Sequence, residues 1–114
     1  MQVEVRKKSD VVIVDMSGRL VAGVGDQVLR DIVGELLAEK QKKILLNLTQ
    51  VTAIDSAGVG ELVGSLRNSR HAGAQIKILN MHERVRKALH LTHILPLFEV
   101  FEDEKTAIQH FSAS

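Results

Sequence analysis

The chain has 114 residues, with 15 basic and 14 acidic side chains and a net charge of +1. It has no cysteine, which excludes disulfides and a cysteine-ligated zinc and is compatible with a reducing compartment. The net charge gives no sign of a basic surface for nucleic acid. Trp and Tyr are absent and Phe occurs three times, so there is no aromatic platform for stacking bases either. The sequence begins without the apolar core of a signal peptide, and no apolar run approaches the roughly 20 residues of a membrane span. We therefore expect a cytoplasmic protein without membrane insertion, folded as a single domain over residues 1–114.

The N-terminal residues predict a β-hairpin. Residues 3–7 alternate weakly and predict an edge strand, while the β-branched run 11–14 predicts a buried strand. A short polar link joins the two. We expect the second strand to stop at Ser17 and Gly18.

The next segments predict a helix and a buried strand. Residues 26–40 have the apolar stripe of an amphipathic helix, with Asp26 as its candidate N-cap. Residues 44–48 then predict a strand buried on both faces. The apolar stripe of the helix consists of Leu29, Ile32, Val33, Leu36 and Leu37.

A second helix is expected to begin near residue 56 and to end near Gly73, a suitable residue for a helix C-terminus. Residues 75–79 predict the following strand. Asn80 and Glu83 form a capping-box pattern that predicts a third helix. The inward-facing residues expected on these two helices are Val59, Leu62, Val63, Leu66, Val85, Ala88 and Leu89.

The C-terminal part predicts a short strand and a last helix. Pro96 marks a connection, residues 98–101 predict the strand, and Asp103 is expected to cap the helix. The apolar face of that helix is Ala107, Ile108 and Phe111.

The predicted order of elements is β-β-α-β-α-β-α-β-α. Strands that alternate with helices indicate an α/β fold with a mostly parallel sheet and helices packed on it. The first strand would lie antiparallel at an edge, because a short link joins it to the second.

Residues 54–60, Ile-Asp-Ser-Ala-Gly-Val-Gly, are the most informative segment. Ser56 falls at the N-cap or in the first turn of the second helix, where a hydroxyl commonly caps the backbone. It could also be a phosphorylation site, because a helix N-terminus tolerates a phosphate. The two interpretations are compatible. Asp55 could orient the hydroxyl, and Gly58 could leave room for another protein.

The chain resembles the STAS domain of anti-sigma factor antagonists. The resemblance rests on residues 17–20 (Ser-Gly-Arg-Leu), 44–48 (Ile-Leu-Leu-Asn-Leu), 54–60 and 97–101 (Leu-Phe-Glu-Val-Phe) with the helix that follows. It spans essentially the whole chain and implies the STAS fold.

The resemblance also implies a partner switch without catalysis or cofactor in this chain. An anti-sigma factor that is also a serine kinase would bind the chain while Ser56 is bare, and would phosphorylate Ser56 and be released. A PP2C-type phosphatase would remove the phosphate. While the anti-sigma factor is bound to the unphosphorylated chain, it would leave its sigma factor free for transcription.

The resemblance places the partner-binding residues in two segments. The first is Asp55, Ser56, Ala57 and Gly58, and the second is the loop over residues 19–25, with Arg19, Val21 and Gly23. Two positions differ from the family's pattern. Ala57 stands where Ser or Thr is common, and Val21 stands where Asp is usual.

Other functions remain open at this stage. A STAS protein can also be a subunit of a transport complex or of a stress-sensing scaffold, in which case Ser56 is only a cap. Gly58 and Gly60 give a partial dinucleotide-binding pattern, but Val63 occupies the third glycine position and Asn80 the acidic position. The five histidines lack metal-ligand spacing, which favours surface positions.

Overall fold

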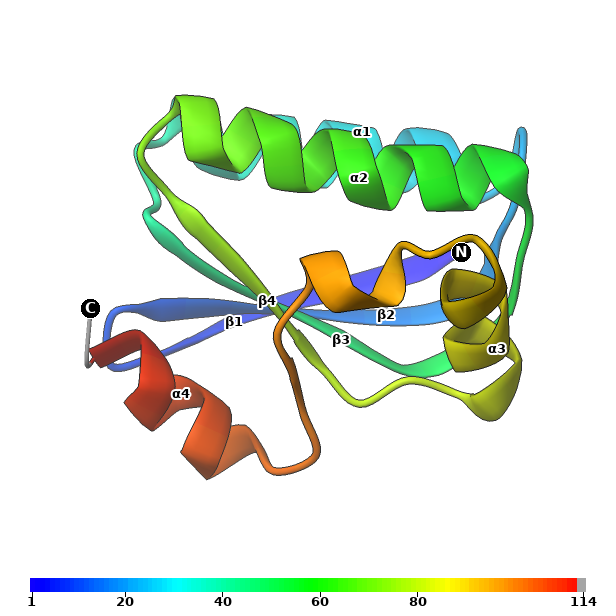
Figure 1. Ribbon diagram of the computed structural model, residues 1–114. Helices are drawn as coiled ribbons and strands as arrows, with labels where there is room; N and C mark the ends of the chain where they lie inside the picture. Colours follow the sequence, from blue (N-terminus) through cyan, green and yellow to red (C-terminus); the bar gives the residue numbers. More distant parts are fainter. Residues whose placement is uncertain (113–114) are drawn as a thin grey trace.

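The computed structural model describes residues 1–112 and shows a five-stranded sheet with helices on both faces (Figure 1). The strands lie in the order β1-β2-β3-β4-β5. β1 is antiparallel to β2, and the other neighbours are parallel. The bounds are β1 Gln2–Lys8, β2 Val11–Leu20, β3 Lys43–Ile54, β4 Gln75–Leu79 and β5 Val100–Phe101. The predicted α/β class, element order and antiparallel edge strand are therefore confirmed.

The helices divide unequally between the two faces of the sheet. Helices α1, α2 and α3 pack on one face, where they share a large apolar core with β2, β3 and β4. Helix α4 packs on the other face, over a smaller apolar cluster. The bounds are α1 Asp26–Ala38, α2 Ser56–His71, α3 Glu83–Leu91 and α4 Glu104–Ser112, with a short 3₁₀ turn, η1, at Leu95–Leu97.

The two cores follow from the alternation of side chains along the buried strands. On β3, Ile44 and Leu46 face α1, α2 and α3, whereas Leu45 faces α4. On β2, Val12 and Val14 join the larger core and Ile13 joins the smaller one. Each of these uninterrupted apolar runs therefore contributes side chains to the cores on both faces of the sheet.

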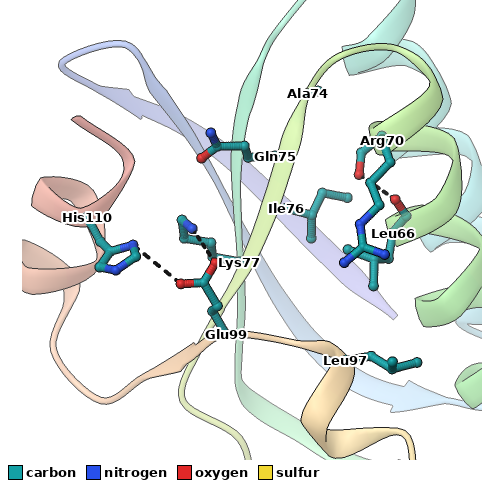
Figure 2. Close-up of a pocket in the computed structure, with 10 residues that line it drawn as sticks. Leu66, Arg70, Ala74, Gln75, Ile76, Lys77, Leu97, Glu99 and His110 are labelled. Carbon is teal, nitrogen blue, oxygen red and sulfur yellow. Dashed lines mark hydrogen bonds and ion pairs between the residues drawn. The ribbon is translucent and has the colours of Figure 1, made fainter. Parts of the chain in front are cut away.

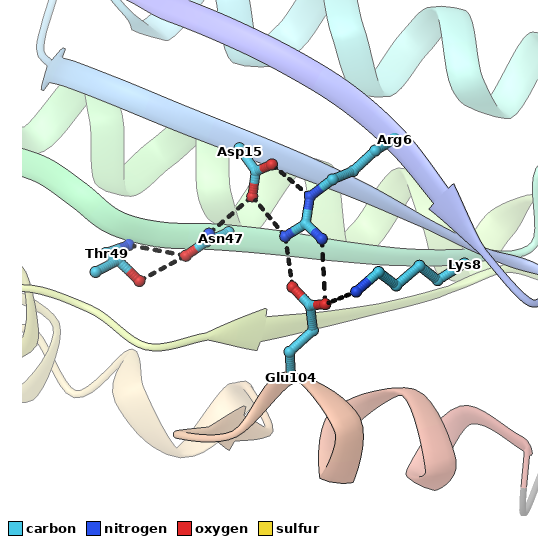
Figure 3. Close-up of polar contacts among 6 residues, drawn as sticks. All are labelled: Arg6, Lys8, Asp15, Asn47, Thr49 and Glu104. Carbon is cyan, nitrogen blue, oxygen red and sulfur yellow. Dashed lines mark hydrogen bonds and ion pairs between the residues drawn. The ribbon is translucent and has the colours of Figure 1, made fainter.

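Polar contacts also hold α4 against the sheet (Figure 3). Arg6 of β1 donates from Nε to Oδ2 of Asp15 on β2 at 2.6 Å and from a terminal nitrogen to Oε2 of Glu104 at 3.1 Å. Lys8 reaches the same Glu104 oxygen at 2.8 Å, and Asn47 donates to Asp15 at 2.7 Å. Charged groups thus join the first turn of α4 to β1 and β2, and the amide of Asn47 extends the network to β3.

β2 does not stop at Ser17 and Gly18 as predicted. It continues through Gly18, which adopts φ +119°, to Leu20. The pairing with β3 shifts register on both sides of this stretch and ends with Leu20 opposite Ile54. A glycine accommodates this irregularity because it has no side chain to clash at positive φ.

Two predicted helix caps are wrong, and two predicted helix ends are confirmed. Gly25, not Asp26, is the N-cap of α1, and His82, not Asn80, is the N-cap of α3. Asp103 does cap α4 by accepting from the N–H of Thr106 at 2.8 Å. Gly73 follows the last turn of α2 with φ +72°, as expected.

The last strand is shorter than predicted. Only Val100 and Phe101 pair with β4, opposite Ile78 and Leu79. Phe98 instead follows η1 and is buried in the larger core. Within residues 1–112, therefore, no strand pairs with Ile76 on the side of β4 that faces away from β3.

Candidate functional site

The candidate site lies where β2 and β3 end side by side. Leu20 and Ile54 are the last paired residues of these parallel strands. The loop after β2 and the first residues of α2 therefore leave the sheet at the same edge. The backbone N–H of Asp55 also approaches the carbonyl of Leu20 at 3.4 Å.

Asp55 joins the loop to the helix. Its Oδ1 accepts from the N–H of Gly58 at 3.0 Å, which makes Asp55 the N-cap of α2. Its Oδ2 accepts from the N–H of Ala22 at 3.0 Å. The Ala22 N–H, followed by that of Gly58, lowers the pKa of the Asp55 carboxyl, so the group is charged at neutral pH.

Ser56 is the first residue of α2, and its side chain is exposed. Within residues 1–112, no hydrogen bond of its hydroxyl is described. Asp55 performs the capping that a serine commonly performs at this point. The carboxylate of Asp55 is bonded to two backbone N–H groups and does not orient the hydroxyl, contrary to the prediction.

Gly58 is buried, and its missing side chain serves internal packing. A Cβ atom at this position would lie 2.1 Å from the carbonyl oxygen of Leu20. The prediction that Gly58 leaves room for a partner is therefore wrong, because the end of β2 takes that room. Gly60 is exposed instead, and outside the adjacent backbone of α2 no heavy atom lies within 4 Å of the position of its Cβ.

Three residues of the loop were predicted to bind the partner, and they differ in how far they are exposed. Arg19 and Gly23 are exposed, and Val21 is half-buried. Gly23 has φ +74° and donates its N–H to Asp26 at 2.9 Å. The carbonyl of Val21 accepts from the N–H groups of Val24 and Gly25, both at 3.1 Å. These bonds fold the loop into a compact turn.

Helices α1 and α2 lie side by side behind this loop. Arg30 of α1 donates from Nε to Glu61 of α2 at 3.0 Å. Ala57 is half-buried in the first turn of α2, and Val24 is a large apolar side chain left 42% exposed. Asp55, Ser56 and the loop therefore share one edge of the molecule with the first turns of two helices.

Three other kinds of site receive no support. A dinucleotide phosphate would need the free N–H groups at the start of α2, and that of Gly58 already donates to Asp55. Residues 1–112 contain no group of three or more His, Cys, Asp and Glu side chains that could hold a metal ion. Within the same residues, no helix has the length and apolarity to cross a membrane.

Comparison with known proteins identifies the family of the chain. The family model of the STAS domain matches residues 2–107. The chain belongs to the STAS domain family. This membership confirms the family resemblance of the sequence and accounts for the five-stranded sheet with four helices.

Individual relatives cover nearly the whole chain. The Anti-sigma F factor antagonist of Paenibacillus polymyxa is 21% identical over 95% of this chain and 92% of its own. The crystal structure of TM1081 from Thermotoga maritima has a TM-score of 0.86, with 23% identity over 95% of this chain and 92% of that one. The Bacillus protein SpoIIAA in its phosphorylated form has a TM-score of 0.72, with 19% identity over 96% and 99% of the two chains. The two solved structures share the fold of this chain.

Sequence reasoning missed the role of Asp55 as cap and tether. A signal was present, because Asp is as good an N-cap as Ser and stands directly before the helix. The bond to Ala22 could not be foreseen, since it depends on the irregular extension of β2. The family resemblance implied that the loop lies near Ser56, and the structure joins the loop to the start of α2 through Asp55.

Proposed function

We propose that this chain is an anti-sigma factor antagonist whose binding to an anti-sigma factor is controlled by phosphorylation of Ser56. One observation carries the proposal: the Ser56 hydroxyl is exposed and has no capping role, because Asp55 caps the helix. A serine with no structural task at the start of a helix is free for modification. The relative from Paenibacillus polymyxa, named as an anti-sigma F factor antagonist, supports the antagonist part of the proposal.

Phosphorylation at this position would change the surface and leave the fold intact. The phosphate adds about −1.5 to −2 charge units. The positive end of the α2 dipole favours this charge, whereas the ionised Asp55 next to it opposes it. The two effects act in opposite directions on stability. At the contact with the partner, a bulky, negatively charged phosphate would replace the small hydroxyl of Ser56.

The partner surface consists of Ser56 and the neighbouring loop. Arg19 and Gly23 are exposed, and Val24 offers an apolar contact beside them. Gly60, one helical turn after Ser56, keeps the approach to the hydroxyl open. Val21, which stands where the family usually has Asp, removes a charge from this surface and would favour a partner with a less basic contact.

In this mechanism the chain is a substrate and a binding partner, not an enzyme. The kinase would be the anti-sigma factor itself, acting on the bare Ser56 hydroxyl. A PP2C-type phosphatase would restore the bare serine. The chain needs no cofactor for either step, because its contribution is an accessible serine on a preformed surface.

The test uses three tagged baits in extracts of the native cells: wild type, Ser56→Ala and Ser56→Asp. Wild type and Ser56→Ala are expected to retain an anti-sigma factor of the serine kinase class, and Ser56→Asp is expected to lose it. Thermal unfolding of each bait is the control for folding. Equal retention of the same partner by all three baits would contradict the proposal and would favour a STAS subunit of a transport complex or scaffold.

A further inference from the structure

A pocket of about 350 Å³ lies at the opposite end of α2 from Ser56 (Figure 2). It runs along the edge of β4 between the last turns of α2 and helix α4. Its floor on the α2 side is apolar and consists of Leu66, Ala74, Ile76 and Leu97. The volume is at the lower end of the range typical of small-molecule sites.

Arg70, an exposed residue near the end of α2, supplies a guanidinium to the lining of this pocket. In Figure 2 the side chain extends from α2 toward Ile76 and Leu66. Within residues 1–112, no carboxylate or carbonyl partner of this guanidinium is described. A guanidinium beside an apolar floor is a donor fork that matches a carboxylate.

A backbone donor faces the same space. The N–H of Ile78 donates to the carbonyl of Glu99 at 2.9 Å, across the gap between β4 and the segment leading into β5. Residues two apart on a strand direct their N–H groups to the same side. The N–H of Ile76 therefore also points to this edge, where β5 has no residue to pair with it.

The second wall of the pocket is a set of paired side chains, Lys77, Glu99 and His110, that is already organised. Lys77 is only 4% exposed, and its Nζ lies 2.7 Å from Oε1 of Glu99 and 5.1 Å from the centre of the Phe111 ring. The other oxygen of Glu99 lies 3.4 Å from Nδ1 of His110. The carboxylate of Glu99 is paired with Lys77, so the two charges cancel. The charge of Arg70 therefore makes the lining of the pocket positive overall.

We infer that this pocket binds a small organic carboxylate, held by the guanidinium of Arg70 and the N–H of Ile76, with its apolar body on Leu66, Ala74 and Leu97. The Lys77–Glu99–His110 wall closes the pocket on the α4 side. The site is separate from Ser56 and does not depend on the proposed function.

The experiment is a titration of the ¹⁵N-labelled full chain with sodium hexanoate, followed by NMR. We expect saturable shifts of the backbone amides of Ile76, Lys77 and Leu97, with millimolar or tighter affinity. Hexan-1-ol, with the same apolar body and no charge, should bind about tenfold more weakly or not at all.

Two variants sharpen the test. Arg70→Ala should weaken hexanoate binding about tenfold. Arg84→Ala removes the same charge from an exposed position on α3 and should leave binding unchanged. No saturable shift with hexanoate, equal binding of hexan-1-ol, or unchanged binding by Arg70→Ala would each overturn the inference. Shifts produced only by an extended acidic peptide would also overturn it, and would identify the β4 edge as a strand-pairing site.

Discussion

The two faces of the sheet are held by different kinds of interaction. Helices α1, α2 and α3 rest on a large apolar core. The site around Ser56 lies on this side and is held by the close backbone contact at Gly58 and by the uncharged N–H groups that donate to Asp55. Helix α4 rests on a small apolar cluster and on the charged chain of Arg6, Asp15, Glu104 and Lys8. Apolar and backbone packing thus fixes the position of Ser56, whereas ion pairs between side chains contribute much of the contact between α4 and the sheet. The two regions should therefore respond differently to added volume, to salt and to acid.

Added volume tests the packed side, and we expect the largest effect there. Gly58→Ala places a methyl group 2.1 Å from the Leu20 carbonyl, and neither backbone segment can move freely. The free energy of unfolding should fall by about 1–3 kcal/mol. Denaturant titration of the purified variant measures this change.

Gly60→Ala is the matched control two residues later. Open space surrounds that position, and alanine favours a helix over glycine by about 1 kcal/mol. We therefore expect Gly60→Ala to stabilise the protein. If both substitutions shift stability in the same direction, the contrast between a packed and an open glycine is wrong.

Removal of the tether tests the polar part of the site. Asp55→Ala deletes the acceptor of both the Gly58 and the Ala22 N–H groups. The variant should melt at a lower temperature, and the amides of Ala22 and Gly58 should exchange hydrogen faster. Unchanged exchange at Ala22 would show that the loop is held without Asp55.

Acid and salt test the α4 side. The guanidinium of Arg6, and then the ammonium of Lys8, lower the pKa of Glu104 from 4.5 to about 2. This group therefore stabilises the fold above pH 4.5, and its contribution is lost as the pH falls toward 2. Glu104→Gln should remove that part of the acid dependence, worth roughly 1 kcal/mol or less after solvent screening.

The readout is the free energy of unfolding of wild type and Glu104→Gln across this pH range. Salt at neutral pH should speed amide exchange in α4 in wild type and leave Ala22 and Gly58 unaffected, because the donors to Asp55 carry no charge. A uniform response of both regions to salt would remove the distinction between the two faces.

The smallest expected effect concerns the phosphate mimic. Ser56→Asp puts a negative charge at the favourable end of α2 but next to Asp55. The opposing effects should leave the free energy of unfolding within about 0.5 kcal/mol of wild type. A loss of several degrees in melting temperature would show that modification at Ser56 acts by unfolding the site.

Much of the fold could be predicted because its signals are local. The uninterrupted apolar runs of β2 and β3, the stripes of α1 and α2, and Gly73 each depend on neighbours in sequence. The errors arose where distant contacts decide the outcome. The extension of β2 past Gly18 depends on pairing with β3, and the shortening of β5 depends on the burial of Phe98 in the core.

The site was predicted in outline and corrected in detail. The positions of Ser56 and the loop follow from two parallel strands that end together. The roles of Asp55 and Gly58 do not follow from sequence, since both depend on how closely Leu20 and Ala22 approach α2. The local sequence around Asp55 and Gly58 is the same whether these residues are exposed to a partner or are engaged in internal contacts. Only the structure shows that Asp55 caps α2 and binds the loop, and that Gly58 packs against Leu20.

Phosphorylation of Ser56 is tested most directly by mass spectrometry of the intact protein and its peptides, isolated from its native cells during growth, starvation and stress. We predict a fraction carrying one phosphate, localised to Ser56, that changes with the condition. Absence of phosphate on Ser56 in every condition, or its localisation to another residue, would contradict the account.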